Sequence, residues 1–499
     1  MGRPETEVLK AARGGYRPQV VWQALGPANR IPLGLKERRI LLALFDLLAL
    51  SLSFALSLHL RRDSIPAFRA LQLLVWFVWP SLVWFVAART FDMYDPTRPT
   101  SVGGILAGVS KAAALTYLAF LLLPYFMPGL PARRLALLLP FLVLWAAAAG
   151  LRLLYLRFFD RPAFARNVVV LGAGWAGRTI AELLLSRGNH SFRILGFVDD
   201  DPAKWGTVVI SPKESSPDDP VEIPVLGDRS VLRELMQSGV LDAVILAVTH
   251  DVDGDLFQLL MDGLEKGIEV VPMPTLYEQL TGRIPIEHVG ENWYVAMPVR
   301  AVPSAAWVAL KRLMDVVLAG AGALFLVLVL PFIALAIRLD SPGPVFYTQW
   351  RVGKGGKLFR IVKFRSMVRD AENGRAVWTR PNDARVTRVG KLLRKTHLDE
   401  FPQFWNILRG EMSVVGPRPE RPEFVEELAR EIPFYRVRHA VKPGMAGWAL
   451  VKHGYVSSKE DAMLRLQYDL YYIKHQSLWL DLEILLKTFL DTLKLRGRA

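Results

Sequence analysis

Four long apolar blocks in the first third of the chain constrain its fold more than any other feature. They cover residues 39–60, 69–88, 105–126 and 135–156. About 20 consecutive apolar residues are enough for a helix to cross the hydrocarbon core of a bilayer. A helix also satisfies its backbone polar groups internally, which lipid demands. The sequence therefore predicts a four-helix transmembrane domain over residues 39–160.

The charges that flank these blocks predict their orientation. Lysine and arginine are concentrated before the first block, between the second and the third, and after the fourth, and they are fewer on the opposite side. Cytoplasmic flanks of membrane helices carry such an excess. We therefore expect residues 1–38 to form a cytosolic N-terminal segment and the chain after residue 160 to lie in the cytoplasm.

Composition excludes several kinds of chemistry. The 499 residues include no cysteine, and the formal net charge is +15. Disulfides, thiolate nucleophiles, iron–sulfur clusters and cysteine zinc sites are therefore excluded, which leaves carboxylates, imidazoles and hydroxyls as catalysts. A basic excess in a membrane protein suits an anionic lipid surface or a phosphate-bearing substrate, and nucleic acid is the third possibility, which position along the chain decides. We expect membrane lipid as a partner and no nucleic acid.

Residues 161–285 are predicted to form a cytosolic Rossmann-like domain. Short apolar runs typical of buried strands alternate there with helical patterns. The predicted strands cover residues 167–171, 194–198, 243–248 and 268–271, and the predicted helices cover residues 178–187 and 231–237. Such alternation is typical of a doubly wound fold with a parallel sheet.

A glycine fingerprint follows the first of these strands. Gly172, Gly174 and Gly177 have the G-x-G-x-x-G spacing. Asp199 ends the second strand, where a dinucleotide-binding fold places its ribose-binding acid. Two interpretations follow: these residues bind a nucleotide, or they are vestigial and the glycines only tighten a turn. A lone fingerprint favours the second.

A fifth apolar run covers residues 315–339 and contains Pro331. Proline in a helix interior removes a hydrogen bond and kinks the chain. Lys311 before the run and Arg338 after it favour the same, cytoplasmic side for both ends. We therefore predict a re-entrant helix over about residues 312–340, broken at Pro331, which enters one leaflet and returns.

A basic β-hairpin is predicted next, with strands over residues 345–352 and 358–364. Glycines at positions 353, 355 and 356 form its turn. This cluster lacks the G-x-x-x-x-G-K-[ST] spacing of a P-loop. ATP hydrolysis is therefore not indicated.

Two carboxylates in the last part of the chain are the candidate catalytic residues. Asp399 and Glu400 precede Pro402 at the start of a predicted helix, where backbone N–H groups and the helix dipole stabilise negative charge. Such a pair can attack phosphorus and hold Mg²⁺. Basic residues close by in the sequence attract oxyanions, and the candidate phosphate-binding residues are Lys363, Arg365, Arg394 and Arg418.

Four strings in this region resemble one enzyme family. They are KFRSM at 363–367, LRKTHLDEFPQFWNILRGEMSVVGPRPERPEF at 393–424, VKPGMAGW at 441–448 and YDLYYIKHQSLWLDLEILLKT at 468–488. They resemble the bacterial sugar transferases, which are polyprenyl-phosphate hexose-1-phosphate transferases of the monotopic phosphoglycosyl transferase superfamily. The likeness defines a catalytic domain at residues 307–499, preceded by a linker at residues 286–306. The upstream domains resemble those of the large members that start O-antigen, exopolysaccharide or capsule synthesis.

The resemblance implies a two-step reaction. Asp399 would attack the β-phosphorus of a UDP-hexose, glucose or galactose, to release UMP and leave an aspartyl-phosphosugar. Undecaprenyl phosphate would then accept the sugar phosphate and become undecaprenyl-diphosphate-hexose. Glu400 matches the Mg²⁺-associated residue, with Asp399 as a further candidate ligand, and Arg394, Arg418 and Lys363 match positive residues near the phosphates. The family also implies a multi-pass protein of the bacterial inner membrane, with its catalytic domain on the cytoplasmic face, that forms a homodimer.

Two other functions compete with this one. A membrane-bound, NAD-dependent nucleotide-sugar dehydratase or epimerase would use the glycines at 172–177, but it needs a catalytic Tyr/Lys pair near them, which the sequence does not offer. A non-catalytic scaffold for polysaccharide export leaves the cluster between Arg394 and Arg418 unexplained. Phosphoglycosyl transfer accounts for the most residues.

Overall fold

The computed structural model describes residues 34–60, 70–96, 101–122, 134–159, 164–186, 191–210, 221–248, 253–286, 304–369, 371, 383–454 and 458–494. The chain divides into two compact units. One comprises Met1–Leu280 with His288–Gly290, and the other comprises Thr281–Glu287 with Glu291–Ala499. The predicted N-terminal segment 1–38 and the predicted linker 286–306 lie almost wholly outside the described residues.

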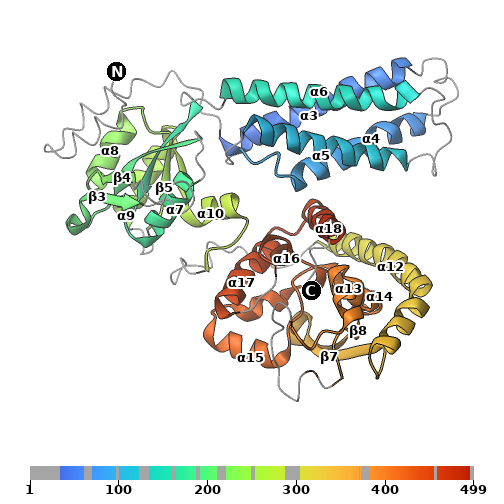
Figure 1. Cartoon of the computed structure of the whole chain (residues 1–499). Helices are drawn as coiled ribbons and strands as arrows, with labels where there is room; N and C mark the ends of the chain where they lie inside the picture. The colour runs from blue at the N-terminus through green and yellow to red at the C-terminus, as the bar shows by residue number, and fades with distance from the viewer. Residues whose placement is uncertain are drawn as a thin grey trace. The chain divides into compact units, whose positions relative to one another are not determined.

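Four long apolar helices begin the first unit (Figure 1). They are α3 (Leu35–Leu60), α4 (Ala70–Thr90), α5 (Val102–Leu121) and α6 (Arg134–Phe159). Each is long and apolar enough to cross a membrane, and each predicted apolar block falls on one of them. Fully buried alanines such as Ala49, Ala87, Ala112 and Ala148 line the core between them, and small residues let membrane helices approach closely. These helices identify a membrane protein.

A buried ion pair joins α3 to α6. The carboxylate of Asp46 and the guanidinium of Arg152 are both buried, and Arg152 Nη2 donates to Asp46 Oδ2 at 2.8 Å. Arg152 Nη1 donates to the other carboxylate oxygen. The hydroxyl of Tyr94, in the turn after α4, also donates to Asp46. Three segments of the bundle thus share one carboxylate.

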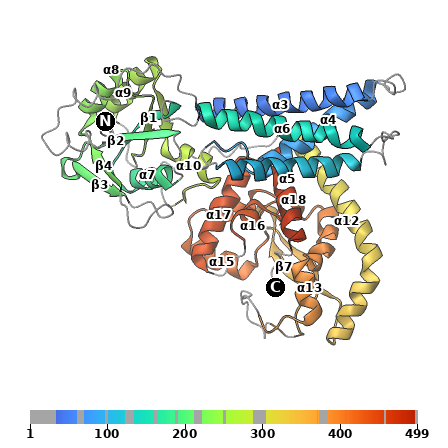
Figure 2. The same ribbon diagram turned by 45° about the horizontal axis from the view of Figure 1, so that its top comes forward.

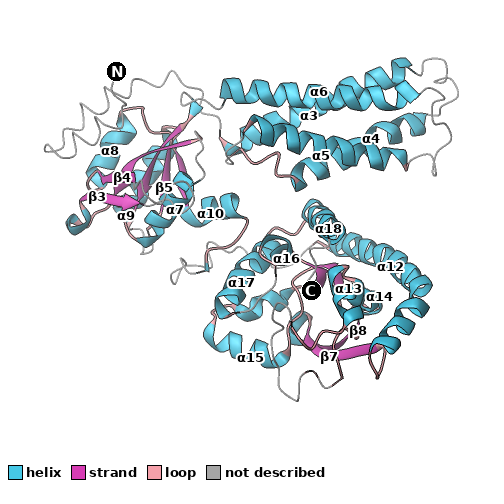
Figure 3. Cartoon of the chain, viewed as in Figure 1, coloured by secondary structure: helices cyan, strands magenta, loops and turns pink. Residues whose placement is uncertain are grey.

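The first unit continues into a six-stranded sheet with the order β3-β4-β2-β1-β5-β6. The strands are β1 (Arg166–Leu171), β2 (Phe192–Val198), β3 (Gly206–Ile210), β4 (Val221–Val225), β5 (Ala243–Leu246) and β6 (Glu269–Pro272). All neighbouring pairs are parallel except β3 with β4. The helices are α7 (Trp175–Ser186), α8 (Arg229–Gln237), α9 (Gly254–Glu265) and α10 (Met273–Thr281), with a short 3₁₀ helix, η4 (Pro202–Lys204). This confirms the predicted α/β domain with its parallel sheet (Figure 3).

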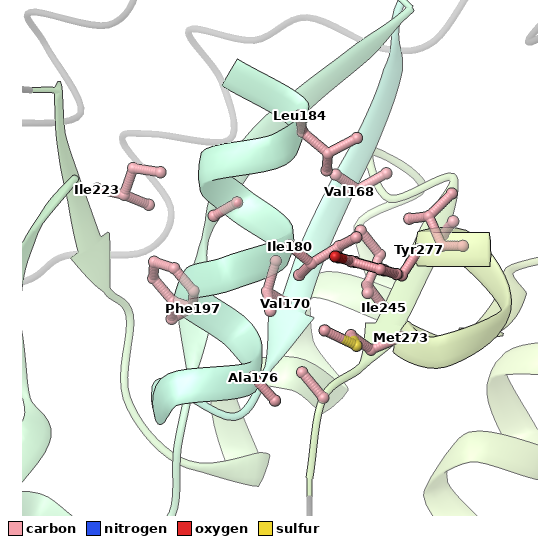
Figure 4. Packing of buried hydrophobic residues seen from close by; sticks show 14 of the residues in the cluster. Val168, Val170, Ala176, Ile180, Leu184, Phe197, Ile223, Ile245, Met273 and Tyr277 are labelled. Atoms are coloured by element: carbon pink, nitrogen blue, oxygen red, sulfur yellow. The ribbon is translucent and has the colours of Figure 1, made fainter. Parts of the chain in front are cut away.

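The apolar strand β1 forms the centre of this domain because both of its faces are covered. Val168 and Val170 pack with residues of α7 and α10, and Figure 4 shows them beside Ile180 and Tyr277. Val169 and Leu171 point to the opposite face, where they pack with residues of α8 and α9. A strand buried on both faces reads as a continuous apolar run.

The second unit contains one long helix and a compact body of short elements (Figure 2). The elements are α12 (Ala305–Asp340), β7 (Phe346–Val352), η6 (Lys354–Gly356), β8 (Leu358–Phe364), α13 (Arg388–Lys395), η7 (Leu398–Gln403), α14 (Phe404–Leu408), β9 (Ser413–Val415), α15 (Pro422–Glu431), η8 (Tyr435–Ala440), β10 (Gly444–Ala446), α16 (Trp448–Lys452), α17 (Lys459–Lys474) and α18 (Leu478–Leu493). The antiparallel pair β7 and β8 is the predicted hairpin.

Helix α12 differs from the predicted broken helix. Pro331 lies inside a single helix of 36 residues, so the predicted break at Pro331 is not an interruption, and the helix is instead continuous and curved (Figure 1). Proline removes a single backbone donor, and a long helix can bend at that point without ending. The helix is the fifth among the described residues that is long and apolar enough to cross a membrane.

Both ends of α12 contact the same compact body. Near its start, Lys311 Nζ donates to Asp481 Oδ2 of α18 at 2.6 Å. At its end, Asp340 Oδ2 accepts a hydrogen bond from the backbone N–H of Val389 at 2.9 Å, and Ile337 is buried against Phe364. A straight 36-residue helix would be about 54 Å long. The curvature therefore brings its two ends back to one body.

Candidate active site

The 3₁₀ helix η7 positions the two candidate carboxylates. Phe401 in η7 and Phe404, the first residue of α14, both pack on α12. The rings of Phe401 and Phe325 are 5.9 Å apart, and a Cβ atom at Gly322 would lie only 2.3 Å from the ring of Phe404. Gly322 therefore allows the start of α14, directly after η7, to approach α12 closely.

Glu400 forms the centre of a buried charge cluster. It is 6% exposed. Lys363 Nζ donates to its Oε1 at 3.0 Å, Arg418 Nη1 donates to its Oε2 at 3.2 Å, and Arg418 Nη2 donates to Oε1. Burial by itself raises the pKa of Glu400, but the charges of Arg418 and Lys363 outweigh it and hold the pKa well below its usual range. Glu400 is therefore ionised at neutral pH.

Asp399 has the opposite electrostatic environment. Its carboxyl group is 8% exposed. Burial, and then the negative charge of Glu400, raise its pKa to about 6, although Lys363, Arg394 and Arg418 act in the other direction. Two adjacent carboxylates whose environments separate their pKa values are typical of paired catalytic carboxylates. Asp399 is thus an anion near neutral pH that is held with little hydration, which favours nucleophilic attack.

The structure brings most of the predicted phosphate-binding residues to this cluster. Lys363 on β8 and Arg418 after β9 contact Glu400 directly. Arg394, at the end of α13, donates from Nε to the hydroxyl of Ser366 at 2.9 Å, and its charge lowers the pKa of Asp399. These three cations surround the two carboxylates, which suits a site for phosphate oxygens.

Arg365 does not join them, so the structure does not bring this predicted phosphate-binding residue to the cluster. Its Nη2 donates to the carbonyl oxygen of Ser341 at 2.6 Å, and its Nη1 donates to that of Pro342 at 2.6 Å. The side chain is 7% exposed. Arg365 therefore binds the carbonyl groups just after the C-terminal end of α12, where the negative end of the helix dipole stabilises a cation.

Two supporting residues were not predicted. Asn406 joins α14 to the hairpin, because its Nδ2 donates to the carbonyl of Arg360 at 2.7 Å and its Oδ1 accepts from the N–H of Val362 at 3.2 Å. Arg438 donates to the carbonyl oxygen of Arg418 at 2.9 Å. Positions 400, 403 and 406 are spaced three apart in the sequence, which is a signal that could have indicated Asn406. Arg438 had no comparable signal, because it lies 20 residues away in the chain.

The two carboxylates fit a magnesium ion that also binds a substrate. Magnesium is usually held by one or two carboxylates together with substrate phosphates and water. A carboxylate has about four lone-pair sites, and three hydrogen bonds from Lys363 and Arg418 reach Glu400. Glu400 therefore retains acceptor capacity beside Asp399. No group of three or more metal-binding side chains occurs among the described residues, so the predicted Mg²⁺ would need the substrate's oxygens.

The glycine fingerprint forms a separate candidate site in the first unit. Gly172 has a φ of +107°, and a Cβ atom at Gly177 would lie 2.0 Å from the carbonyl oxygen of Gly172. Both glycines are therefore required by the turn itself, whereas the space beside Gly174 is open. Asp199 Oδ2 accepts a hydrogen bond from the N–H of Ala173 at 2.8 Å. Nucleotide binding by this turn stays a prediction.

The last part of the chain is similar to known proteins. Residues 306–495 match the family described as bacterial sugar transferase. The chain is 45% identical over 249 residues to a UDP-N-acetylgalactosamine-undecaprenyl-phosphate N-acetylgalactosaminephosphotransferase from Aeromonas hydrophila. It is 46% identical over 182 residues to a UDP-glucose:undecaprenyl-phosphate glucose-1-phosphate transferase from Escherichia coli strain K12.

The matched regions cover different shares of this chain and of its relatives. The first match covers 50% of this chain and 58% of its relative, and the second covers 36% and 39%. A third relative, the exopolysaccharide production protein PSS of Rhizobium leguminosarum bv. phaseoli, is 40% identical over 199 residues, which is 38% of this chain and 98% of that protein. The chain thus spans about three fifths of the first relative's length, about two fifths of the second's and nearly all of the third's.

Proposed function

This chain belongs to the bacterial sugar transferase family, and we propose that it transfers a hexose-1-phosphate from a UDP-hexose to undecaprenyl phosphate. The buried cluster of Asp399 and Glu400 with Lys363 and Arg418 is the observation that carries the proposal. The product would be undecaprenyl-diphosphate-hexose, the first lipid-linked intermediate of an O-antigen, exopolysaccharide or capsule. One phosphoanhydride replaces another, so the reaction needs no ATP.

The proposed mechanism has two displacements at phosphorus. An oxygen of Asp399 attacks the β-phosphorus of the donor, the bond to the bridging oxygen of the UMP group breaks, and UMP leaves with that electron pair. A phosphate oxygen of the lipid then attacks the same phosphorus and releases the Asp399 carboxylate. The bond between the sugar and its phosphate stays intact, so the anomeric configuration is retained.

The residues around Asp399 stabilise negative charge on the reacting phosphates. Arg418 and Lys363 supply positive charge close to the reacting phosphates, and Glu400 holds both cations in place through the contacts described above. Arg394 adds a third positive charge near Asp399. A bound Mg²⁺, held by Glu400 or Asp399 together with the donor's phosphates, would neutralise negative charge on the leaving group.

Helix α12 supports a proposal for the membrane arrangement. Both of its ends contact one body, whereas a helix that spans a bilayer has its ends on opposite sides. Its middle exposes large apolar side chains such as Leu324, Leu328 and Phe332. We therefore propose that α12 enters one leaflet and returns, that α3 to α6 span the inner membrane, and that the catalytic body lies on the cytoplasmic face, where lipid phosphate and soluble UDP-sugar meet.

A panel of UDP-sugars tests the proposed function. Purified full-length protein in nanodiscs would be given undecaprenyl phosphate, Mg²⁺ and UDP-glucose, UDP-galactose or UDP-N-acetylgalactosamine in turn. The last is included because a relative is named for that sugar. We expect UMP release and a labelled lipid with at least one donor. No UMP release with any of the three, in protein that is folded, would contradict the proposal.

The pH profile of the first step is a further prediction. Since the pKa of Asp399 is raised to about 6, its carboxylate should be protonated, and unable to attack, at lower pH. We expect kcat/KM for the donor to fall about tenfold for each pH unit below 6 and to level off above it. The measurement is the single-turnover rate of UMP release at subsaturating donor, without acceptor, between pH 5 and pH 8. A rate that stays constant from pH 5 to pH 7 would contradict this role for Asp399.

A further inference from the structure

Gln403 is a buried amide at the end of η7, the helix that carries the two carboxylates. It is 2% exposed. Its Nε2 is closed to solvent and has no hydrogen-bond partner within the described part of the chain. Leaving a buried N–H group without an acceptor is unfavourable, and such groups in native proteins usually have a functional explanation or a bound partner.

The position of Gln403 points to that partner. Residues 400 and 403 share one face of the 3₁₀ helix, so the amide lies on the same side as Glu400. The polar neighbours on this side are satisfied, since Glu400 binds Lys363 and Arg418, and Asn406 binds the hairpin through both of its amide atoms. The unsatisfied amide of Gln403 therefore lies on the same short helix as the two carboxylates that carry the proposed chemistry, three residues after Glu400.

We propose that Gln403 contacts the donor substrate and donates an N–H group to an oxygen of the transferred sugar phosphate. This inference rests on the proposed function. A carboxamide donates equally well to a phosphate oxygen or to a sugar hydroxyl, and both arrive with the donor. Nε2 is closed to solvent, so contact with the donor requires a rotation of the Gln403 side chain that turns its N–H₂ group toward the substrate.

The variant Gln403→Met tests this contact, because methionine has a similar length and no donor. We expect kcat/KM for the UDP-sugar to fall about 10- to 100-fold, the range expected when a hydrogen bond to a charged group is lost. We also expect Tm not to fall, because the buried amide nitrogen that the variant removes has no partner among the described residues. A purely structural amide would behave in the opposite way, with a lower Tm.

A second amide supplies the matched control. Gln467 on α17 is also buried, and one atom of its amide, the oxygen Oε1, has no partner among the described residues. It lies outside the charge cluster, so Gln467→Met should leave kcat/KM within about twofold of the wild type. The variant Gln403→Asn keeps the amide but shortens it, and we expect it to lose activity as Gln403→Met does while it remains folded.

Each outcome decides the proposal. UDP-glucose and UDP-galactose differ only at C4, so an unequal loss would identify the C4 hydroxyl as the acceptor, and an equal loss would place the contact elsewhere on the transferred sugar phosphate. Wild-type kinetics in Gln403→Met, or a lower Tm in both Gln403 variants, would overturn the inference while the transfer activity of the wild type stands. A folded wild type that transfers no sugar phosphate would overturn the proposed function and this inference together.

Discussion

Replacing Asp399 with asparagine should abolish sugar phosphate transfer without destabilising the protein. An amide does not attack phosphorus under these conditions, and loss of a covalent nucleophile typically costs about 10⁴- to 10⁶-fold in turnover. Stability should be kept or slightly increased, because burial and the charge of Glu400 disfavour the ionised form of Asp399 and asparagine carries no charge. UMP release and the thermal unfolding of Asp399→Asn, compared with the wild type, measure both effects.

The neighbouring carboxylate provides the contrast. Glu400→Gln leaves Lys363 and Arg418 partly buried beside a neutral group, so this variant should unfold at a lower temperature.

Mass spectrometry of wild-type protein mixed with donor alone should find a sugar phosphate on the peptide that contains Asp399. If Asp399→Asn retained more than a few per cent of activity, or if the adduct lay on another peptide, Asp399 would not be the nucleophile.

The sequence predicted those parts of the fold in which one local pattern dominates. Strand β1 is apolar at every position from 168 to 171 because helices cover both faces of the sheet, and the glycine turn after it appears where it was expected. The hairpin strands end within a residue of their predicted bounds. In each case the signal comes from residues adjacent in the chain, so periodicity and turn chemistry were sufficient.

The prediction was less successful where distant contacts decide the outcome. Lys363 and Arg365 are two residues apart, so an extended strand would place both side chains on the same face. Strand β8 ends at Phe364, and Arg365 instead reaches the end of α12, 24 residues earlier in the chain. Helix α12 likewise continues through Pro331, because packing at both ends, not the proline alone, determines its course.

The buried charges of the membrane bundle should have the largest effect on stability. Asp46→Asn would leave Arg152 buried without a counter-charge, and Arg152→Met would leave Asp46 in the same condition. Breaking a buried pair in this way costs about 3–5 kcal/mol. For a unit of this size, we expect each single variant to lower Tm by roughly 10 °C. Tryptophan fluorescence during heating in nanodiscs would measure it, because Trp84 is buried in the bundle.

The double variant tests whether the ion pair itself, and not each residue separately, stabilises the bundle. Asp46→Asn combined with Arg152→Met removes both charges and keeps an acceptor for the hydroxyl of Tyr94, which donates to position 46. We expect it to be more stable than either single variant, because no unpaired charge remains in the apolar interior. Arg157→Met, on the exposed side of the same helix, is the matched control and should change Tm little, because exposed charges contribute about 0–1 kcal/mol. If the effects of the two single variants simply added in the double variant, the ion pair would not be the interaction that joins α3 to α6.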